Sequence, residues 1–179
     1  MSKKIFALVA VMMTSLYAGT SLAATANGVM LTANAFMYNT TVEVTPGTKS
    51  ESKVSIYDIK LGYLSGNGLY LGGIYTLRNS EAGNSSSDGN AMGASIGYVG
   101  SSGFYVKGHY LVSAELGDNK EGTGIQGDFG YLTNITGALV VGVELTYRSI
   151  EYKKNDTAPT MEKLKQDELF PMLTVGFVF

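Results

Sequence analysis

The stretch ALVVGVELTYRSIE, residues 138–151, is mostly apolar and yet carries Glu144 and Arg148. Its odd positions from Leu139 to Tyr147 are all apolar or aromatic, whereas its even positions include both charged residues. Successive side chains of a strand point to opposite faces, so this alternation predicts a strand with one apolar and one mixed, polar face. The β-branched content favours a strand over a helix. Both charged side chains are therefore expected on the polar face.

The same alternation appears in seven other segments of the chain. They are residues 29–44, 54–64, 69–78, 91–99, 104–116, 125–132 and 169–179. Together with the first stretch they give eight expected strands. The length of 179 residues suggests one domain.

The connections between these segments also alternate. Three are tight and rich in Gly, Asn and Ser, which supply turn conformations: residues 65–68, 100–103 and 133–137. Four are longer and polar: residues 45–53, 79–90, 117–123 and 154–163. In an up-and-down arrangement, the tight turns and both termini fall at one end, and the long loops fall at the other.

The N-terminus is a separate segment. Two lysines precede a short apolar run, residues 5–18, and small residues follow. This is the pattern of a secretory signal peptide, and the run is shorter than the roughly 20 residues of a membrane helix. We expect residues 1–23 to be the signal peptide, with cleavage after Ala23 or Ala26, and residues 24–179 to form the exported domain.

Composition excludes several classes of function. The chain has no Cys, which rules out disulfides, thiol chemistry and Cys-based metal sites. Its formal net charge of -2 and its lack of a basic patch argue against nucleic-acid binding. One His and no calcium-type acidic loop predict no dedicated metal and no cofactor.

Alternation alone does not say which face is buried. A lipocalin-like barrel places the apolar face inside, whereas a membrane barrel places it outside. The polar face is too sparsely charged for a surface in water, and eight strands enclose a space just wide enough for side chains to fill. We therefore expect a closed eight-stranded antiparallel up-and-down transmembrane β-barrel with a balanced polar network in its lumen. The expected network is Asp58, Lys60, Arg78, Lys107, His109, Glu115, Asp128, Glu144 and Arg148.

Two features of the apolar face support this choice. Outward aromatic residues gather at the tight-turn end, as in the interfacial girdle of a membrane barrel. They are Tyr63, Tyr98, Phe104 and Tyr131, with Phe179 at the terminus. The chain also ends in FPMLTVGFVF, residues 170–179, where apolar residues alternate up to a terminal Phe. Pro171 lies within this stretch. Because proline has no N–H to donate to a neighbouring strand, it requires a bulge or a position where that hydrogen bond is not made.

On these residues the chain resembles the small eight-stranded outer-membrane barrels, such as the OmpA transmembrane domain and OmpX. The resemblance covers the whole exported domain as architecture. It implies a Gram-negative outer membrane with periplasmic termini, contact with lipid and lipopolysaccharide, and transient binding to periplasmic chaperones and the barrel assembly machinery. By the same resemblance, the assembly signal is Leu173, Val175, Phe177 and Phe179. The resemblance implies no single activity.

Four functions are compatible with this architecture. The first is a monomeric structural or surface-exposed envelope protein with a blocked lumen. The second is a narrow, porin-like gated pore in which Glu144 or Asp128 switches between Lys107 and Lys60. The third is surface binding or adhesion through the loops.

The fourth function, lipid A hydrolysis or acyl transfer, has the weakest support in the sequence. A catalytic His needs a nucleophile and a carboxylate within hydrogen-bonding reach. Ser113 and Glu115 follow His109 on the expected polar face, but an extended strand holds them about 13 and 20 Å away. We therefore expect no enzyme.

Overall fold

The computed structural model describes residues 20–21, 27–44, 48–83, 85–158, 160 and 163–179. The expected signal peptide lies outside the described residues, except for Thr20 and Ser21. Among the described residues, no helix has the length and apolar character needed to cross a membrane. The described chain is built from strands, and the fold is all-β.

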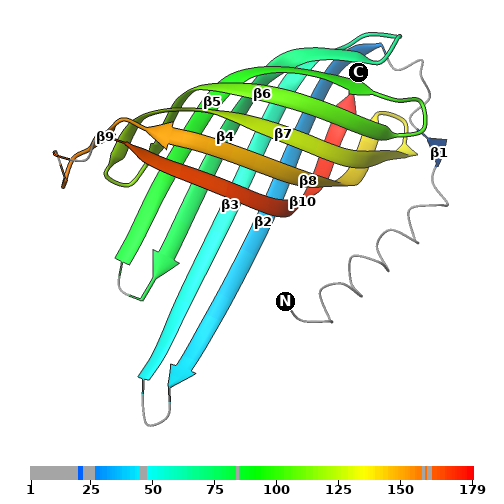
Figure 1. Ribbon diagram of the computed structural model, residues 1–179. Coiled ribbons are helices and arrows are strands. Elements are labelled where there is room, and N and C mark those ends of the chain that lie inside the picture. The colour runs from blue at the N-terminus through cyan, green and yellow to red at the C-terminus, as the bar shows by residue number, and fades with distance from the viewer. Residues whose placement is uncertain (1–19, 22–26, 45–47, 84, 159, 161–162) are drawn as a thin grey trace.

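Eight long strands form an antiparallel up-and-down sheet that closes into a ring (Figure 1). They are β2 (Gly28–Val44), β3 (Thr48–Leu64), β4 (Leu69–Ala82), β5 (Ser85–Val99), β6 (Phe104–Leu116), β7 (Asn119–Thr136), β8 (Leu139–Tyr152) and β10 (Leu164–Val178). Strand β10 pairs with both β8 and β2 and so closes the ring. Two short strands, β1 (Thr20–Ser21) and β9 (Lys154–Asn155), pair with the ends of β7.

All eight expected strands are present, but the prediction of long polar loops is wrong for three of the four, because residues 45–53, 79–90 and 117–123 belong mostly to strands. Ala82 pairs with Ser85, and Leu116 pairs with Asn119, so these connections are as short as the tight turns. The polar segments continue the strands because the backbone can pair there without an apolar face. Strands that are polar on both faces carry no periodic signal in the sequence.

The polar face lies inside the ring and the apolar face lies outside. On β6, Lys107 and His109 are buried, while Val106 and Tyr110 are more than half exposed. The same alternation runs along β3, where Asp58 is fully buried. The ring therefore has the reverse of the apolar-inside arrangement of a lipocalin-like barrel.

Exposed aromatic side chains form two tiers on the outer face. The expected tier at the tight-turn end includes Tyr63, Tyr98 and Phe104, with Tyr131 half-buried. A second tier toward the opposite end was not predicted, and it consists of Tyr57, Tyr75, Tyr110 and Tyr147. The four residues of the C-terminal pattern, Leu173, Val175, Phe177 and Phe179, are also exposed.

Side chains fill the interior in three layers. At the tight-turn end, an apolar layer is formed by Met30, Leu64, Tyr70, Val99, Tyr105, Leu132 and Val140. Polar and charged residues fill the middle. Beyond them lie two further apolar clusters, one made of Ile74, Ala91, Leu111, Ala114, Ile150 and Tyr152 and the other of Ile56, Phe170 and Met172. The polar layer is thus closed off from both ends by buried apolar side chains.

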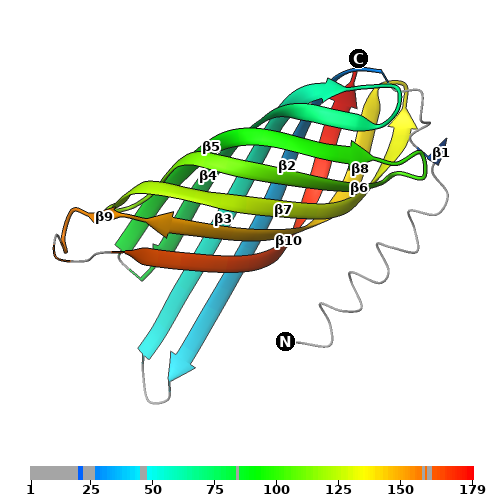
Figure 2. The same cartoon turned by 45° about the horizontal axis from the view of Figure 1, so that its top comes forward.

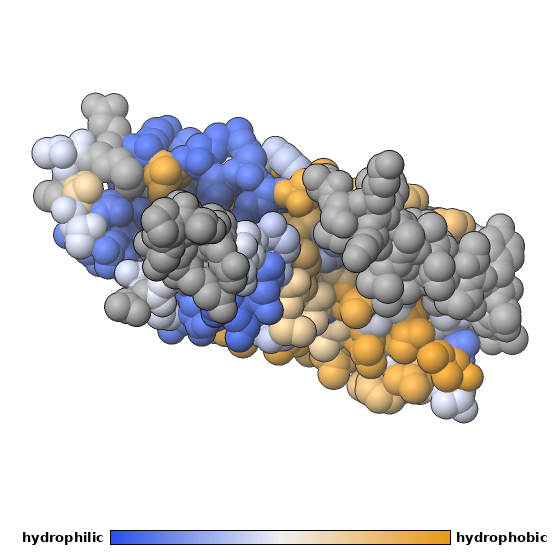
Figure 3. Space-filling model, turned by 90° about the horizontal axis from the view of Figure 1, so that it is seen from below, coloured by the Kyte–Doolittle hydropathy of each residue, from blue (hydrophilic) through white to orange (hydrophobic). Residues whose placement is uncertain are grey.

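The hairpin of β2 and β3 projects beyond the rest of the ring at the end opposite the tight turns (Figure 2). The hairpin of β2 and β3 extends farthest in both ribbon views. Figure 3 shows one side of the molecule, with hydrophilic residues gathered at one end and hydrophobic residues at the other. The outer surface is therefore divided along the strands into an apolar zone and a polar zone.

Candidate functional site

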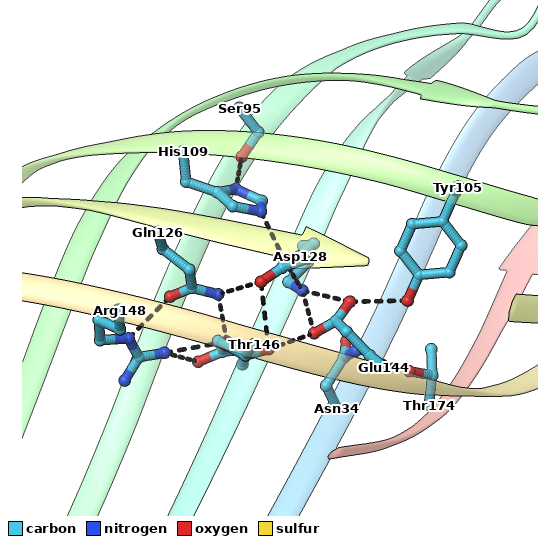
Figure 4. Close-up of polar contacts among 12 residues, drawn as sticks. Asn34, Ser95, Tyr105, His109, Gln126, Asp128, Glu144, Thr146, Arg148 and Thr174 are labelled. Atoms are coloured by element: carbon cyan, nitrogen blue, oxygen red, sulfur yellow. Dashed lines mark hydrogen bonds and ion pairs between the residues drawn. The ribbon is translucent and has the colours of Figure 1, made fainter. Parts of the chain in front are cut away.

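The middle layer of the interior is the candidate site (Figure 4), and within it Lys60 binds carboxylates from two other strands. The Lys60 ammonium donates to the Asp128 carboxylate at 2.5 Å and to both oxygens of Glu144 at 2.7 and 2.8 Å. All three side chains are almost completely buried. They come from β3, β7 and β8, so the ion pairs cross the interior of the ring. Buried charges of opposite sign are stable only when paired in this way.

A second ion pair joins β8 to β3. The Arg148 guanidinium donates to both oxygens of Asp58 at 2.8 and 3.0 Å and, through Nε, to the Gln126 side chain at 2.7 Å. Gln126 in turn donates to Asp58 and Asp128, and this connects the two ion pairs. The result is one continuous network rather than separate bridges.

His109 links Asp128 to the serine of a neighbouring strand. Its Nδ1 lies 2.6 Å from the Ser95 hydroxyl, and its Nε2 lies 2.6 Å from the Asp128 carboxylate. Serine, histidine and aspartate in contact are the elements of a nucleophilic relay. Here Asp128 is also bound by Lys60, and Ser95 is 6% exposed beneath the apolar layers. The Ser95 hydroxyl therefore lies within the buried network.

Lys107 differs from the other interior cations. Its ammonium lies 4.4 Å from the centre of the Tyr70 ring and 4.8 Å from that of Tyr105. The rings stabilise the cation through their electron-rich faces. Tyr105 also donates its hydroxyl proton to Glu144 at 2.7 Å, whereas the buried Tyr70 hydroxyl has no hydrogen-bond partner among the described residues.

The structure brings together seven of the nine residues predicted for the network. These are Asp58, Lys60, Lys107, His109, Asp128, Glu144 and Arg148, each at most 4% exposed. Arg78 lies at the margin, where its guanidinium pairs with Glu168 at 2.5 Å and both side chains are partly exposed. Three cations (Lys60, Lys107 and Arg148) and three carboxylates (Asp58, Asp128 and Glu144) are therefore buried together, and these six charges balance.

The prediction for Glu115 and Ser113 is wrong. The strand register shifts between Leu111 and Ala114, so Ala114 is buried and Ser113 is exposed. A bulge adds one residue to the strand and reverses the face of everything beyond it. The Glu115 carboxylate is 45% exposed and accepts a hydrogen bond from Lys120 that raises the pKa of the Lys120 ammonium.

Several neutral members of the network were not predicted. They are Asn34, Thr76, Ser95, Tyr105, Gln126, Thr146 and Thr174. Gln126, for example, occupies an alternate position of its strand facing the interior, which is the only signal in the sequence. Strand alternation gives the face of each residue, but not which residues on different strands meet.

The described residues include no cluster of His, Asp and Glu that could hold a metal ion. Comparison with protein-family models, curated proteins and solved structures found no match. The resemblance to small outer-membrane barrels therefore stays a prediction from the sequence.

Proposed function

We propose that this chain is an integral outer-membrane β-barrel protein with a side-chain-filled lumen and a structural, non-catalytic role in the envelope. One observation carries the proposal: buried charged residues point into a closed ring, and large apolar residues point out of it. Such a surface is costly in water and suited to lipid. A closed ring also leaves few unpaired backbone groups, which lipid does not tolerate.

The apolar zone has about the height of a bilayer. On β4, exposed apolar side chains run from Leu69 to Leu77. Eight steps of about 3.4 Å, tilted by about 40°, span roughly 21 Å, close to the roughly 25 Å band of known membrane barrels. The two aromatic tiers suit the two interfaces with the head groups.

The orientation follows from the ends of the ring. The C-terminus lies at the end without projecting strands, which fits the periplasmic side, and the projecting polar strands fit the outside. The partners would be membrane lipid and lipopolysaccharide around the apolar zone, with chaperones and the assembly machinery acting during insertion. In its own membrane the chain would be a monomer.

The layered interior favours a plug over the alternative of a narrow pore. A pore would need a polar path through both apolar layers, including Leu132 and Val140, neither of which is exposed. It would also need Glu144 to leave Lys60, Tyr105 and Thr146, which together donate four hydrogen bonds to it. Loop-mediated binding is the second alternative, and the projecting strands favour it because they place polar residues outside the apolar zone.

Planar-bilayer recording tests the proposal. The protein would be purified from the outer membrane of a Gram-negative host and compared with Glu144→Ala and Lys107→Ala. We expect no steady current from any of the three. Steady current in the wild type that either substitution changes would support the pore and contradict the plug.

A further inference from the structure

His109 is an interior titratable group that stands outside the charge balance of the polar layer. It is the single histidine of the chain, and it is 4% exposed. The three buried cations and the three buried carboxylates balance one another without it. A proton gained by its imidazole would therefore be an excess positive charge among buried groups. Such a charge is strongly unfavourable unless a partner neutralises it.

The contacts of the imidazole show which atom would take up that proton. A carboxylate only accepts hydrogen bonds, so Nε2 of His109 carries the proton that lies between it and Asp128, 2.6 Å away. In the neutral imidazole the other nitrogen, Nδ1, is an acceptor, and the Ser95 hydroxyl donates to it at 2.6 Å (Figure 4). Because a serine hydroxyl can also accept, Nδ1 can gain a proton without losing this contact.

Asp128 cannot neutralise a charged His109, because it already binds another cation. The same oxygen, Oδ2, lies 2.6 Å from Nε2 of His109 and 2.5 Å from the Lys60 ammonium. Strand β5 presents only the uncharged Ser95 to the imidazole among the described contacts. The other buried side chains with charges or ionisable hydroxyls are Asp58 on β3, Tyr70 on β4, Tyr105 and Lys107 on β6, and Glu144, Arg148 and Tyr152 on β8. Of these, both carboxylates are already paired, Asp58 with Arg148 and Glu144 with Lys60.

Lys107 is the buried cation that is held least firmly. Lys60 and Arg148 each bind a carboxylate. The contacts of Lys107 among the described residues are with ring faces, and its ammonium lies 4.4 Å from the centre of Tyr70 and 4.8 Å from that of Tyr105. A contact with ring faces holds a cation less firmly than a buried ion pair. An excess positive charge in the polar layer would therefore displace Lys107 first.

We propose that His109 is a proton switch: when Nδ1 gains a proton, the Lys107 ammonium is displaced and the tight-turn end of the lumen opens to water. Tyr70 and Tyr105 belong to the apolar layer of that end, so Lys107 stands where this layer meets the polar layer. Repulsion from the polar layer pushes the ammonium between the two rings. Water follows, because an unpaired ammonium must stay hydrated.

The opening concerns one end of the ring. The apolar side chains toward the opposite end form clusters of their own, which include neither tyrosine. They stay closed when Lys107 moves, so the ring still does not conduct. The switch thus goes beyond the plug of the proposed function and is compatible with it.

The first measurement is whether His109 gains a proton. Because the chain has one histidine, nuclear magnetic resonance of the imidazole nitrogens gives the signals of this residue alone. The folded protein would be titrated from about pH 7.5 to about pH 5, the range in which histidine side chains change charge. We expect the signals to change from those of a neutral to those of a charged imidazole. An imidazole that is still neutral at the end of the titration would overturn the switch.

The second measurement is water access to the apolar layer. The chain has no native Cys, and Val140→Cys places a thiol in this layer, where Val140 is fully buried. Ser102→Cys places one on an exposed turn at the same end. Both would react with a water-soluble dipyridyl disulfide, which labels thiols in acid as well as at neutral pH. The rate at position 140 divided by the rate at position 102 removes the effect of pH on the reagent. We expect this ratio to rise several-fold on acidification, with the same midpoint as the imidazole signals.

Two variants made in the Val140→Cys chain separate the switch from a general loosening in acid. His109→Gln can donate to Asp128 and accept from Ser95, but it cannot become charged, so its ratio should stay low. Lys107→Gln should also stay low although His109 is protonated, because that proton then restores the balance of three cations and three carboxylates.

The outcomes decide between the switch and the plug separately. A wild-type ratio that stays constant, a rise with a different midpoint, or an equal rise in His109→Gln would each overturn the switch and leave the plug in place. The comparison of midpoints uses the wild-type histidine and lysine, so it decides the question even if a variant does not fold. Steady current at either pH in the planar bilayer would overturn the plug.

Discussion

Replacing Lys60 by methionine should destabilise the ring more than any substitution of an exposed charge. The Lys60 ammonium holds two buried carboxylates, those of Asp128 and Glu144. A hydrogen bond to a charged group contributes about 1.5–3 kcal/mol to stability. Losing the contact with both carboxylates should therefore lower the free energy of unfolding by about 3–6 kcal/mol. A separate estimate agrees with this loss: removing one partner of a buried ion pair lowers the free energy of unfolding by about 3–5 kcal/mol.

The matched control is Lys120→Met. Lys120 pairs with Glu115 at 2.8 Å, and both side chains are substantially exposed. Such a pair contributes about 0.2–1 kcal/mol. Adding Glu144→Gln to Lys60→Met removes one of the stranded carboxylates and should recover part of the lost stability, because the interior again holds equal numbers of cations and carboxylates.

Urea unfolding in lipid vesicles, followed by far-ultraviolet circular dichroism, measures these free energies. If Lys60→Met and Lys120→Met lose the same small amount of stability, the buried network does not stabilise the ring. If the double variant is less stable than Lys60→Met alone, the argument from charge balance is wrong.

Further substitutions test other parts of the account. Tyr70→Phe should leave the free energy of unfolding unchanged or slightly raised, because the hydroxyl has no partner, whereas Tyr105→Phe should lower it by about 1.5–3 kcal/mol. In the same unfolding assay, Gly130→Ala should cost about 1–3 kcal/mol, since a Cβ there would lie 2.5 Å from the Tyr105 ring, while Gly127→Ala, in open space, should be neutral. Deleting Phe179 should reduce the amount of protein in the outer membrane, measured by fractionation, without impairing refolding in detergent; equal amounts in the membrane would remove the assembly role.

Alternation in the sequence was sufficient to predict the strands and the faces of most charged residues. Glu144 and Arg148 within an apolar run could only be accommodated by a polar interior, and the structure places both there. The pattern succeeded because the apolar zone forces strict alternation along each strand. Outside that zone, as at Ala82 and Ser85, both faces are polar, so the sequence could not give the strand ends.

Contacts between distant strands could not be predicted. The sequence placed Ser113 on the same face of the strand as His109, but a bulge turns Ser113 outward, and the histidine contacts Ser95 of another strand. A bulge inserts a single residue and leaves no recognisable mark in the composition. The partners of Lys60 depend on how far each strand is staggered around the ring, which alternation does not determine.

The most direct test of the central claim is quenching of tryptophan fluorescence by lipids brominated on their acyl chains. The chain has no native Trp, so Ile96→Trp and Lys53→Trp would each report on one exposed site. The account predicts strong quenching at position 96, in the apolar zone, and little at position 53, on the projecting part of β3. An unquenched tryptophan at position 96 would contradict a ring that stands in a membrane with its apolar face toward lipid.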